Sequence, residues 1–275
     1  MAPPGLAWEG MPTLAPMIAE AAQAEHVDLF QVRFPRLTQA QAADYLLGRL
    51  GAAPSTGVCF PDMSTLNAAR SAPAFRRLLQ HRVITFNDGA GLAFGARLRH
   101  RPFPANLNGT ELTPMLLERA PVGTTVYLLG ARPDVVTRAH EVLAKEFGHV
   151  EFIGAHHGYL NPDLEAHVMA ELRRLRPDLV LVAMGNPLQV ELVDRHLDDP
   201  ELPATLWLGV GGLLDYYGGT LVRAPRWMVR AKLEWLNIVV RQPHKARRYL
   251  LGIPLFLGRC IVMELRGQHD APAAA

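Results

Sequence analysis

A carboxylate that stands between an apolar run and two glycines is the residue best suited to acid–base chemistry in this chain. Asp88 follows the run 83–86 and directly precedes Gly89-Ala90-Gly91. A carboxylate so placed can remove the proton of an attacking hydroxyl group, as a sugar transfer with inversion requires. Asp is also a preferred N-cap residue, so Asp88 could instead cap a helix that begins near Leu92. Residue type alone leaves both roles open.

Glycine and polar residues also follow the other apolar runs, at the point where each run ends. Ligands of an open parallel sheet bind beyond the carboxyl ends of its strands. Glycines there let the backbone approach a diphosphate, and helix N-termini stabilise its charge. Such turns at one edge predict a nucleotide-type site, with the candidates Thr65, Asn67, Asn87, Gly89, Gly91, Gly130, His157, Tyr159, Gly185, Gln189, Gly211, Gly212 and Asp215.

The runs that must position these residues predict a parallel sheet covered on both faces. They are rich in Val, Ile, Leu and Phe without strict polar alternation, and helix-like stretches separate them. This βαβ pattern predicts an α/β fold, a Rossmann-like parallel sheet sandwiched by helices. The predicted strands are 57–60, 83–86, 125–129, 150–153, 179–183 and 205–210, and the predicted helices are 39–50 (capped by Thr38), 68–80, 112–120, 135–147, 163–175 and 190–197.

The chain divides into three regions of different composition. Residues 1–55 are expected to be helical or irregular, 56–222 to form the α/β catalytic domain, and 223–275 to form a basic helical appendage broken by Pro225, Pro243 and Pro254. The net charge of +2 is unevenly distributed, because the segment 223–266 contains ten Lys and Arg residues but only two acidic residues. That segment carries +8 and the rest −6. The imbalance indicates contact with a polyanion or an anionic lipid surface, with a solvated basic face as the alternative.

The cysteines and the N-terminal region indicate a reducing compartment. Cys59 and Cys260 lie far apart and form no CxxC or Cys/His cluster, so neither a disulfide framework nor a zinc site is expected. No basic residue precedes Arg33, and no apolar signal segment with a cleavage site is evident. No run of 18 apolar residues occurs either, so a spanning helix is not expected. We expect a cytoplasmic location.

Two competing interpretations of the same residues are weaker. Gly89-x-Gly91-x-x-x-Gly95 followed by Glu111 approximates the dinucleotide fingerprint of an oxidoreductase, but the third glycine is one place late and no strand clearly delivers Glu111. His156 and His157 should point to opposite faces of a strand, so no metal site is expected. A third class is a non-enzymatic module whose basic tail binds nucleic acid or membrane; we expect no nucleic-acid partner.

An ordered series of short motifs resembles the WecG/TagA/CpsF family of bacterial glycosyltransferases (glycosyltransferase family twenty-six), which includes GumM-type xanthan glucosyltransferases. The resemblance runs from about Thr65 to Phe256. The motifs that carry it are Thr65-x-Asn67, Asp88-Gly-x-Gly91, Gly109, Leu128-Leu-Gly130, Gly154-x-His-x-Gly-Tyr159, Pro177-Asp178, Gly185-x-Pro-x-Gln189, Gly211-Gly-x-x-Asp215, Arg223-Ala-Pro-x-Trp227 and Glu234-Trp-Leu236.

The resemblance implies an inverting, metal-independent transferase without a cofactor. It would use a UDP-sugar and a polyprenyl-diphosphate-linked acceptor, in the biosynthesis of an exopolysaccharide or another cell-surface polysaccharide. It makes Asp88 the proposed base with Thr65 nearby, and it places Asn67, Gln189 and Asp215 in the nucleotide-sugar pocket. The C-terminal arginines, among them Arg223 and Arg230, are expected to close over the diphosphate.

Two departures from the family pattern bear on the donor sugar. Asn106 is expected to bind the sugar or the diphosphate, and it stands where the family usually has an Arg. The loss of that cation changes how the sugar or the diphosphate is held and points to a different donor. Val190 separates Gln189 from Glu191, so Gln189 is the better matched of the pair. The tail 234–256 is similar to the GumM-type members and favours UDP-glucose, with UDP-N-acetylmannosamine or its uronic acid as the alternative.

The segment 241–266 predicts peripheral attachment to a membrane. Basic residues attract anionic headgroups at roughly 1 kcal/mol each, and aliphatic residues interleaved with them can embed shallowly. The same apolar residues could instead pack on the α/β domain, and the two roles are compatible. We expect attachment to the inner face of the plasma membrane, and a homo-oligomer is left open.

Overall fold

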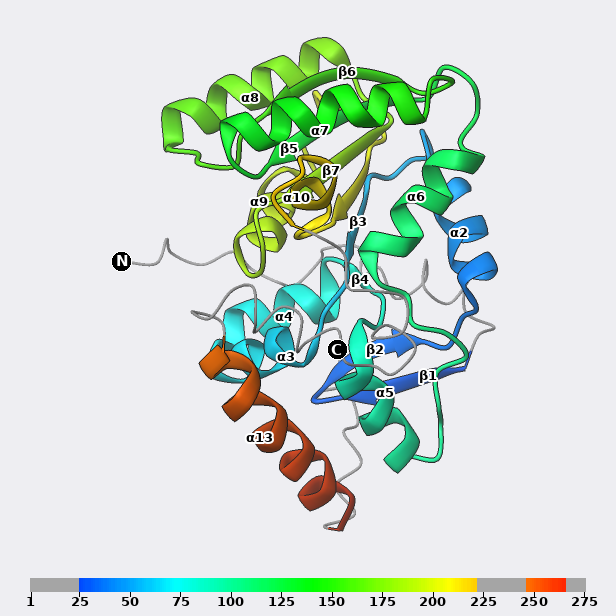
Figure 1. Ribbon diagram of the computed structural model, residues 1–275, viewed down its shortest axis with the longest axis vertical. Coiled ribbons are helices and arrows are strands. Elements are labelled where there is room, and N and C mark those ends of the chain that lie inside the picture. Colours follow the sequence, from blue (N-terminus) through cyan, green and yellow to red (C-terminus); the bar gives the residue numbers. More distant parts are fainter. Residues whose placement is uncertain (1–24, 222–245, 266–275) are drawn as a thin grey trace.

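A computed structural model describes residues 25–221 and 246–265, so Arg223 and Arg230 lie outside the described residues. Six strands form one sheet in the order β4-β3-β8-β7-β5-β6, and every neighbouring pair is parallel. Helices lie on both sides of it (Figure 1). This confirms the predicted Rossmann-like fold and all six runs, as β3 (Thr56–Cys59), β4 (Ile84–Thr85), β5 (Thr125–Gly130), β6 (Glu151–His156), β7 (Leu179–Ala183) and β8 (Leu206–Gly209).

The registers of the central strands bring their carboxyl ends to one edge. Cys59 at the end of β3 pairs with Thr85 of β4 and with Gly209 of β8. Gly209 in turn pairs with Val182 of β7. The loops after these strands therefore meet, as a parallel sheet requires.

Each face of the sheet has its own set of helices. The buried clusters place α3 (Met63–Ser71), α4 (Pro73–His81), α8 (Pro162–Leu175) and α9 (Leu188–His196) on one face, and α2 (Gln39–Leu47), α6 (Gly109–Arg119), α7 (Pro133–Glu146) and α10 (Leu213–Tyr217) on the other. The neighbouring strands β3 and β8 are thus followed by helices on opposite faces. Such a switch in direction is where open α/β sheets bind ligands, so the site is expected beyond β3 and β8.

A hairpin and a C-terminal helix extend the first of these faces. The hairpin consists of β1 (His26–Leu29) and β2 (Val32–Pro35), within the region that was expected to be helical or irregular. The helix α13 (Ala246–Leu265) packs beside it, with the rings of Phe30 and Phe256 5.1 Å apart. Figure 1 shows α13 running alongside α3 and α5 (Gly89–Leu98). Both segments therefore contribute to the core of the catalytic domain.

Two helix predictions change in detail, and proline is involved in both. The predicted helix 68–80 is two helices, since α3 ends at Ser71 and Pro73 is the first residue of α4. Proline is favoured at the first position of a helix but would break the interior of one. The break expected at Pro254 is wrong, because α13 continues through it. Packing of Phe256 and Cys260 into the core offsets the local cost of the proline.

Arg82 is predicted to be the ion-pair residue on which the stability of this face depends most. Its guanidinium is 8% exposed and binds two carboxylates of the α9 region, Asp194 at 2.5 Å and Asp198. Removing one partner of a buried pair leaves the other charge uncompensated. We expect Arg82→Ala to lower the free energy of unfolding by about 2–3 kcal/mol in urea titrations. Arg119→Ala, which breaks an exposed pair with Asp44, is the control and should cost under about 1 kcal/mol; equal losses would contradict the prediction.

Candidate functional site

Asp88 lies at the carboxyl end of β4, and its side chain does not cap the helix that follows. It occupies the N-cap position of α5, yet it makes no side-chain capping hydrogen bond. The amide of Gly89, the first of the helix, donates instead to Asn106 Oδ1 at 2.8 Å. The amide of Asp88 donates to the carbonyl of Pro61, after β3, at 3.1 Å. Capping of α5 therefore does not explain a carboxylate at this position.

Asn87 ties the end of β4 to the segment that carries Asn106. Its side-chain amide donates to the carbonyl of Ala105 at 2.9 Å, and its own carbonyl accepts from the amide of Leu107 at 2.9 Å. The residue is 1% exposed. Asn87 thus lies beneath the edge of the sheet, where it fixes the backbone beside Asp88, although it was predicted to bind substrate.

Thr65 links the loop after β3 to the loop after β7. Its hydroxyl donates to Asp62 Oδ1 at 2.8 Å and accepts from Asn186 Nδ2 at 3.1 Å, and the side chain is buried. Cys59 donates weakly to Asn186 Oδ1, with 3.6 Å between sulfur and oxygen. Thr65 therefore lies near the edge but behind its surface.

Asp62 and Asn186 are the residues of this cluster that the sequence analysis missed. Asp62 precedes Thr65 by three residues and accepts from its amide at 2.7 Å, which is an N-cap pattern readable from the sequence. Asn186 stands between a strand-end glycine and a proline, a position typical of a turn. Nothing in the sequence indicates its bond to Thr65.

Gln189 holds two glycine turns together from below. Its side-chain oxygen accepts from the amides of Gly185 at 3.1 Å and Gly211 at 3.3 Å, and its nitrogen donates to the carbonyl of Gly209 at 2.9 Å. It is 2% exposed, and within the described residues the hydrogen bonds of its side chain go to backbone groups. Gln189 was predicted to line the pocket, and the contacts observed here fix the backbone of the turns at Gly185 and Gly211.

All the edge glycines except Gly212 fall into two groups. Gly89, Gly185 and Gly211 have positive φ angles of 88°, 75° and 55°, and a Cβ added to any of them would meet open space. Gly91 instead approaches Met63, and a Cβ on Gly130 would lie 2.4 Å from the carbonyl oxygen of Ala183. The first group leaves open space beside its α-carbons, although its amides donate to Asn106 and Gln189, and the second group allows close packing. Gly212 belongs with neither, since an added Cβ would be 3.4 Å from Leu221.

Asn67 faces the C-terminal helix. Its side-chain oxygen accepts from Arg259 Nη1 of α13 at 2.7 Å. Burial lowers the pKa of the Arg259 guanidinium, and the nearby charge of Arg70 lowers it further. A positively charged group of α13 is thus brought to a predicted site residue, which the sequence had not connected with this part of the chain.

The rings of His156, the last residue of β6, and His157 lie together, so the expectation that they point to opposite faces is wrong. The ring centroids of His156 and His157 are 4.3 Å apart, because β6 ends at His156. His156 Nδ1 bonds the carbonyl of His157 at 2.8 Å, and the exposed ring of Tyr159 lies 6.2 Å from that of His157. Within the described residues, no group of three or more His, Cys, Asp or Glu side chains is placed to hold a metal ion.

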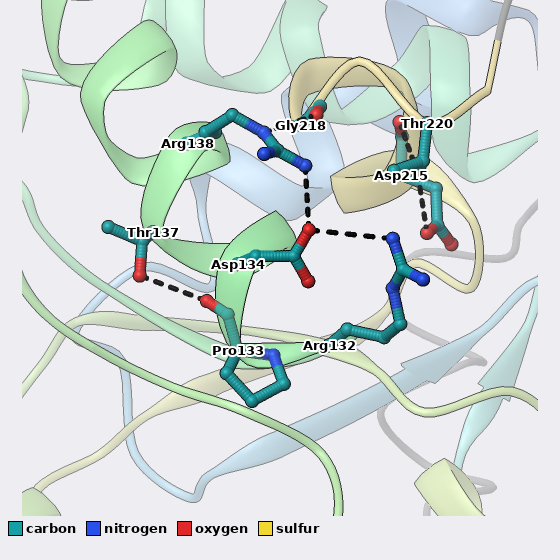
Figure 2. A network of polar contacts seen from close by, with 8 residues as sticks. All are labelled: Arg132, Pro133, Asp134, Thr137, Arg138, Asp215, Gly218 and Thr220. Carbon is teal, nitrogen blue, oxygen red and sulfur yellow. Dashed lines mark hydrogen bonds and ion pairs between the residues drawn. The ribbon is translucent and has the colours of Figure 1, made fainter.

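Asp215 lies at the start of α10, beside the N-terminus of α7 (Figure 2). Its carboxylate accepts from the hydroxyl of Thr220 at 3.0 Å. The adjacent cluster contains Arg138, which donates to Asp134 at 2.9 Å and to the carbonyl of Gly218 at 2.9 Å. Asp215 is half-buried at the β8 end of the edge, on the opposite side of β3 from Asp88.

The dinucleotide interpretation does not fit this geometry. Glu111 lies in the first turn of α6, and it accepts from Gln39 of α2 at 3.0 Å. In the dinucleotide fingerprint the acidic residue follows the second strand and reaches a ribose. The next strand, β5, begins only at Thr125, and Gly95 packs against Leu29 and Cys260. The glycines of α5 therefore serve packing and the Asp88 turn.

Neither cysteine should react in the folded protein. Burial raises the pKa of the Cys59 thiol to about 12 and that of Cys260 to about 11. The nucleophile is the thiolate, so both groups stay protonated and unreactive at pH 8. We expect Ellman's reagent to label neither thiol of the native protein and both in denaturant. Rapid labelling of the native protein would contradict the burial of these groups.

Comparison with known proteins identifies the family of this chain. The sequence model of the Glycosyl transferase WecG/TagA/CpsF family matches residues 27–270. A protein of Staphylococcus aureus (strain MW2), named N-acetylglucosaminyldiphosphoundecaprenol N-acetyl-beta-D-mannosaminyltransferase, is 28% identical over 244 residues, 87% of this chain and 94% of the relative. A protein of the same name from Bacillus subtilis (strain 168) is 30% identical over 172 residues, 62% of this chain and 64% of the relative.

Proposed function

The chain belongs to the WecG/TagA/CpsF family and is a glycosyltransferase, and we propose that it moves an N-acetylhexosamine from a UDP-sugar to a polyprenyl-diphosphate-linked sugar. The observation that carries the proposal is the position of Asp88. It lies at the carboxyl edge of the sheet, in a turn that two hydrogen bonds hold: the amide of Asp88 donates to the carbonyl of Pro61, and the amide of Gly89 donates to Asn106. The Asp88 side chain does not cap the helix that follows.

The chemistry follows from that position. The Asp88 carboxylate takes the proton of the acceptor hydroxyl while the hydroxyl oxygen attacks the anomeric carbon of the donor. The bond from that carbon to the diphosphate breaks, UDP leaves with the electron pair, and the configuration inverts. The open space beside the α-carbons of Gly185 and Gly211 lets the diphosphate come close to the backbone. In this proposal the reaction needs no metal, so EDTA should leave the rate unchanged.

The donor sugar is proposed from the relatives. Their names specify N-acetylmannosaminyl transfer to an N-acetylglucosaminyl-diphosphoundecaprenol. These names do not support UDP-glucose, which the tail had favoured, and they support the alternative, UDP-N-acetylmannosamine. We propose an acceptor of the same chemical class as the one in these names, a polyprenyl-diphosphate-linked amino sugar.

Peripheral attachment to the membrane is part of the proposal, and α13 supplies its support. The apolar residues Leu255, Ile261, Val262 and Leu265 are exposed. Together with Pro254 and Gly258 they form a stripe that is uncharged over 254–265, opposite the buried Phe256 and Cys260. Among the described residues, no helix is long and apolar enough to cross a membrane. We therefore propose that the stripe lies in the headgroup region of the inner face, next to the lipid-linked acceptor.

The test incubates the full chain with a lipid extract of bacterial membranes and radiolabelled UDP-N-acetylmannosamine, UDP-N-acetylglucosamine or UDP-glucose. The expected result is label in the lipid fraction with UDP-N-acetylmannosamine, at a rate that EDTA does not change. Labelling with UDP-glucose alone would overturn the proposed donor. A rate that collapses on chelation and returns with a divalent cation would overturn the metal-free mechanism.

A further inference from the structure

We infer that Asn106 is a positioning residue, which holds the backbone of the Asp88–Gly89 turn and so sets the direction of the catalytic carboxylate. The inference rests on the proposed role of Asp88 as base. It differs from the expectation that Asn106 contacts the sugar or the diphosphate. The side-chain oxygen of Asn106 is committed to an amide of the protein, at 2.8 Å from Gly89 N.

The bond is a helix cap supplied from outside the helix. The first amides of a helix lack partners within it, and an Asn oxygen is among the preferred acceptors for them. Here the residue at the N-cap position is Asp88, whose side chain does not perform this task. Asn106, 17 residues beyond Gly89, performs it. Because Asn106 caps the helix, the carboxylate of Asp88 can stand at its N-terminus without serving as the cap.

The segment around Asn106 is itself fixed at several points. Its two neighbours, Ala105 and Leu107, both bond to Asn87, one residue before Asp88. The carbonyl of Asn106 accepts from Gln39 Nε2 of α2 at 3.3 Å. Hydrogen bonds thus connect the three consecutive residues 105–107 with Asn87 and Gly89, on either side of Asp88, and with Gln39 of α2. A rigid segment of this kind can hold Asp88 to within the small displacements that catalysis tolerates.

The capping oxygen is the feature that matters, so the variants separate it from side-chain size. Asn106→Leu keeps the volume and removes the acceptor, whereas Asn106→Asp keeps an acceptor oxygen of the same reach. Asn161→Leu is the matched control, because Asn161 caps α8 through Leu164 N at 2.8 Å, after the opposite edge strand.

Kinetics should separate positioning from substrate contact. With the sugar donor that supports transfer, we expect Asn106→Leu to lower kcat about tenfold or more, with the KM for the donor unchanged within about twofold. Asn106→Asp should recover most of kcat above neutral pH and lose it toward acid pH, because a second negative charge beside Asp88 disfavours ionisation of the base. A raised KM with unchanged kcat, or no recovery with Asp, would overturn the inference.

A second measurement does not depend on turnover. In the full chain labelled with 15N-glycine, exchange of the Gly89 amide with solvent should become about tenfold faster or more in Asn106→Leu, and should stay slow in Asn106→Asp and Asn161→Leu. Unchanged exchange of the Gly89 amide in Asn106→Leu would show that Asn106 does not hold this amide, and it would overturn the inference. If the wild-type chain transferred no sugar while Gly89 behaved as expected, the proposed function would fail and the capping bond would stand.

Discussion

Asp88→Asn is expected to abolish sugar transfer while the protein stays folded and still binds UDP. The amide has nearly the shape of the carboxylate but cannot accept the proton of the acceptor hydroxyl. General-base catalysis contributes about 10²–10⁴-fold to a rate, so kcat should fall by at least about a hundredfold. The helix N-terminus should not suffer, because Asn106 and not Asp88 caps α5.

The measurements are turnover, UDP affinity by calorimetry and thermal unfolding, all on the same preparation. Asp134→Asn is the matched control, since this exposed carboxylate binds Arg132 and Arg138 (Figure 2). It follows β5, which is not adjacent to β4 in the sheet. We expect it to retain wild-type kcat. Turnover of Asp88→Asn within about tenfold of the wild type would remove Asp88 as the base.

Replacing the exposed apolar stripe of α13 should release the protein from membranes. The variant carries Leu255→Ser, Ile261→Ser, Val262→Ser and Leu265→Ser, all at exposed positions of one helix face. Burying a large aliphatic side chain contributes about 1.5–3 kcal/mol when complete, and shallow insertion yields part of this. We expect the partition coefficient onto vesicles of anionic phospholipid to fall by about a hundredfold or more.

The control for this prediction replaces exposed apolar residues of the catalytic domain. Val122 and Val142 are 86% and 42% exposed and do not belong to α13. Their change to Ser should leave sedimentation with vesicles unchanged. Because the stripe residues are exposed, circular dichroism and thermal unfolding should match the wild type. Equal binding by the α13 variant and the wild type would show that the stripe is not the membrane surface.

The secondary structure followed from short-range sequence patterns. β7 has the predicted bounds 179–183, because five consecutive apolar residues between turns are typical of a strand buried on both faces. Thr38 caps α2 with a reciprocal bond to Gln41, a signal contained in four residues. Alternation of strands and helices then determined the parallel sheet and the edge at which the loops meet.

The hairpin was missed because its turn lacks the usual residues. Phe30 and Gln31 have φ angles of 53° and 66°, in the left-handed region that hairpin turns normally fill with Asn or Gly. The turn is held by tertiary contacts, the ring of Phe256 on Phe30 and Gln80 Nε2 on the carbonyl of Gln31 at 2.9 Å. Local propensity contains no sign of partners so distant in the sequence.

The roles of the site residues divide in the same way. Residue type and position after a strand were enough to bring Asp88 and the open glycines to one edge, since strand direction alone decides where those residues go. Three contacts of the site depended on residues far apart in the sequence. The cap of α5 by the side-chain oxygen of Asn106, the bond from Asn186 to Thr65 and the bond from Arg259 to Asn67 join residues separated by 17, 121 and 192 positions. Hydrogen bonds require donor and acceptor to meet within a few tenths of an ångström, and only the packed chain determines which distant pairs do so.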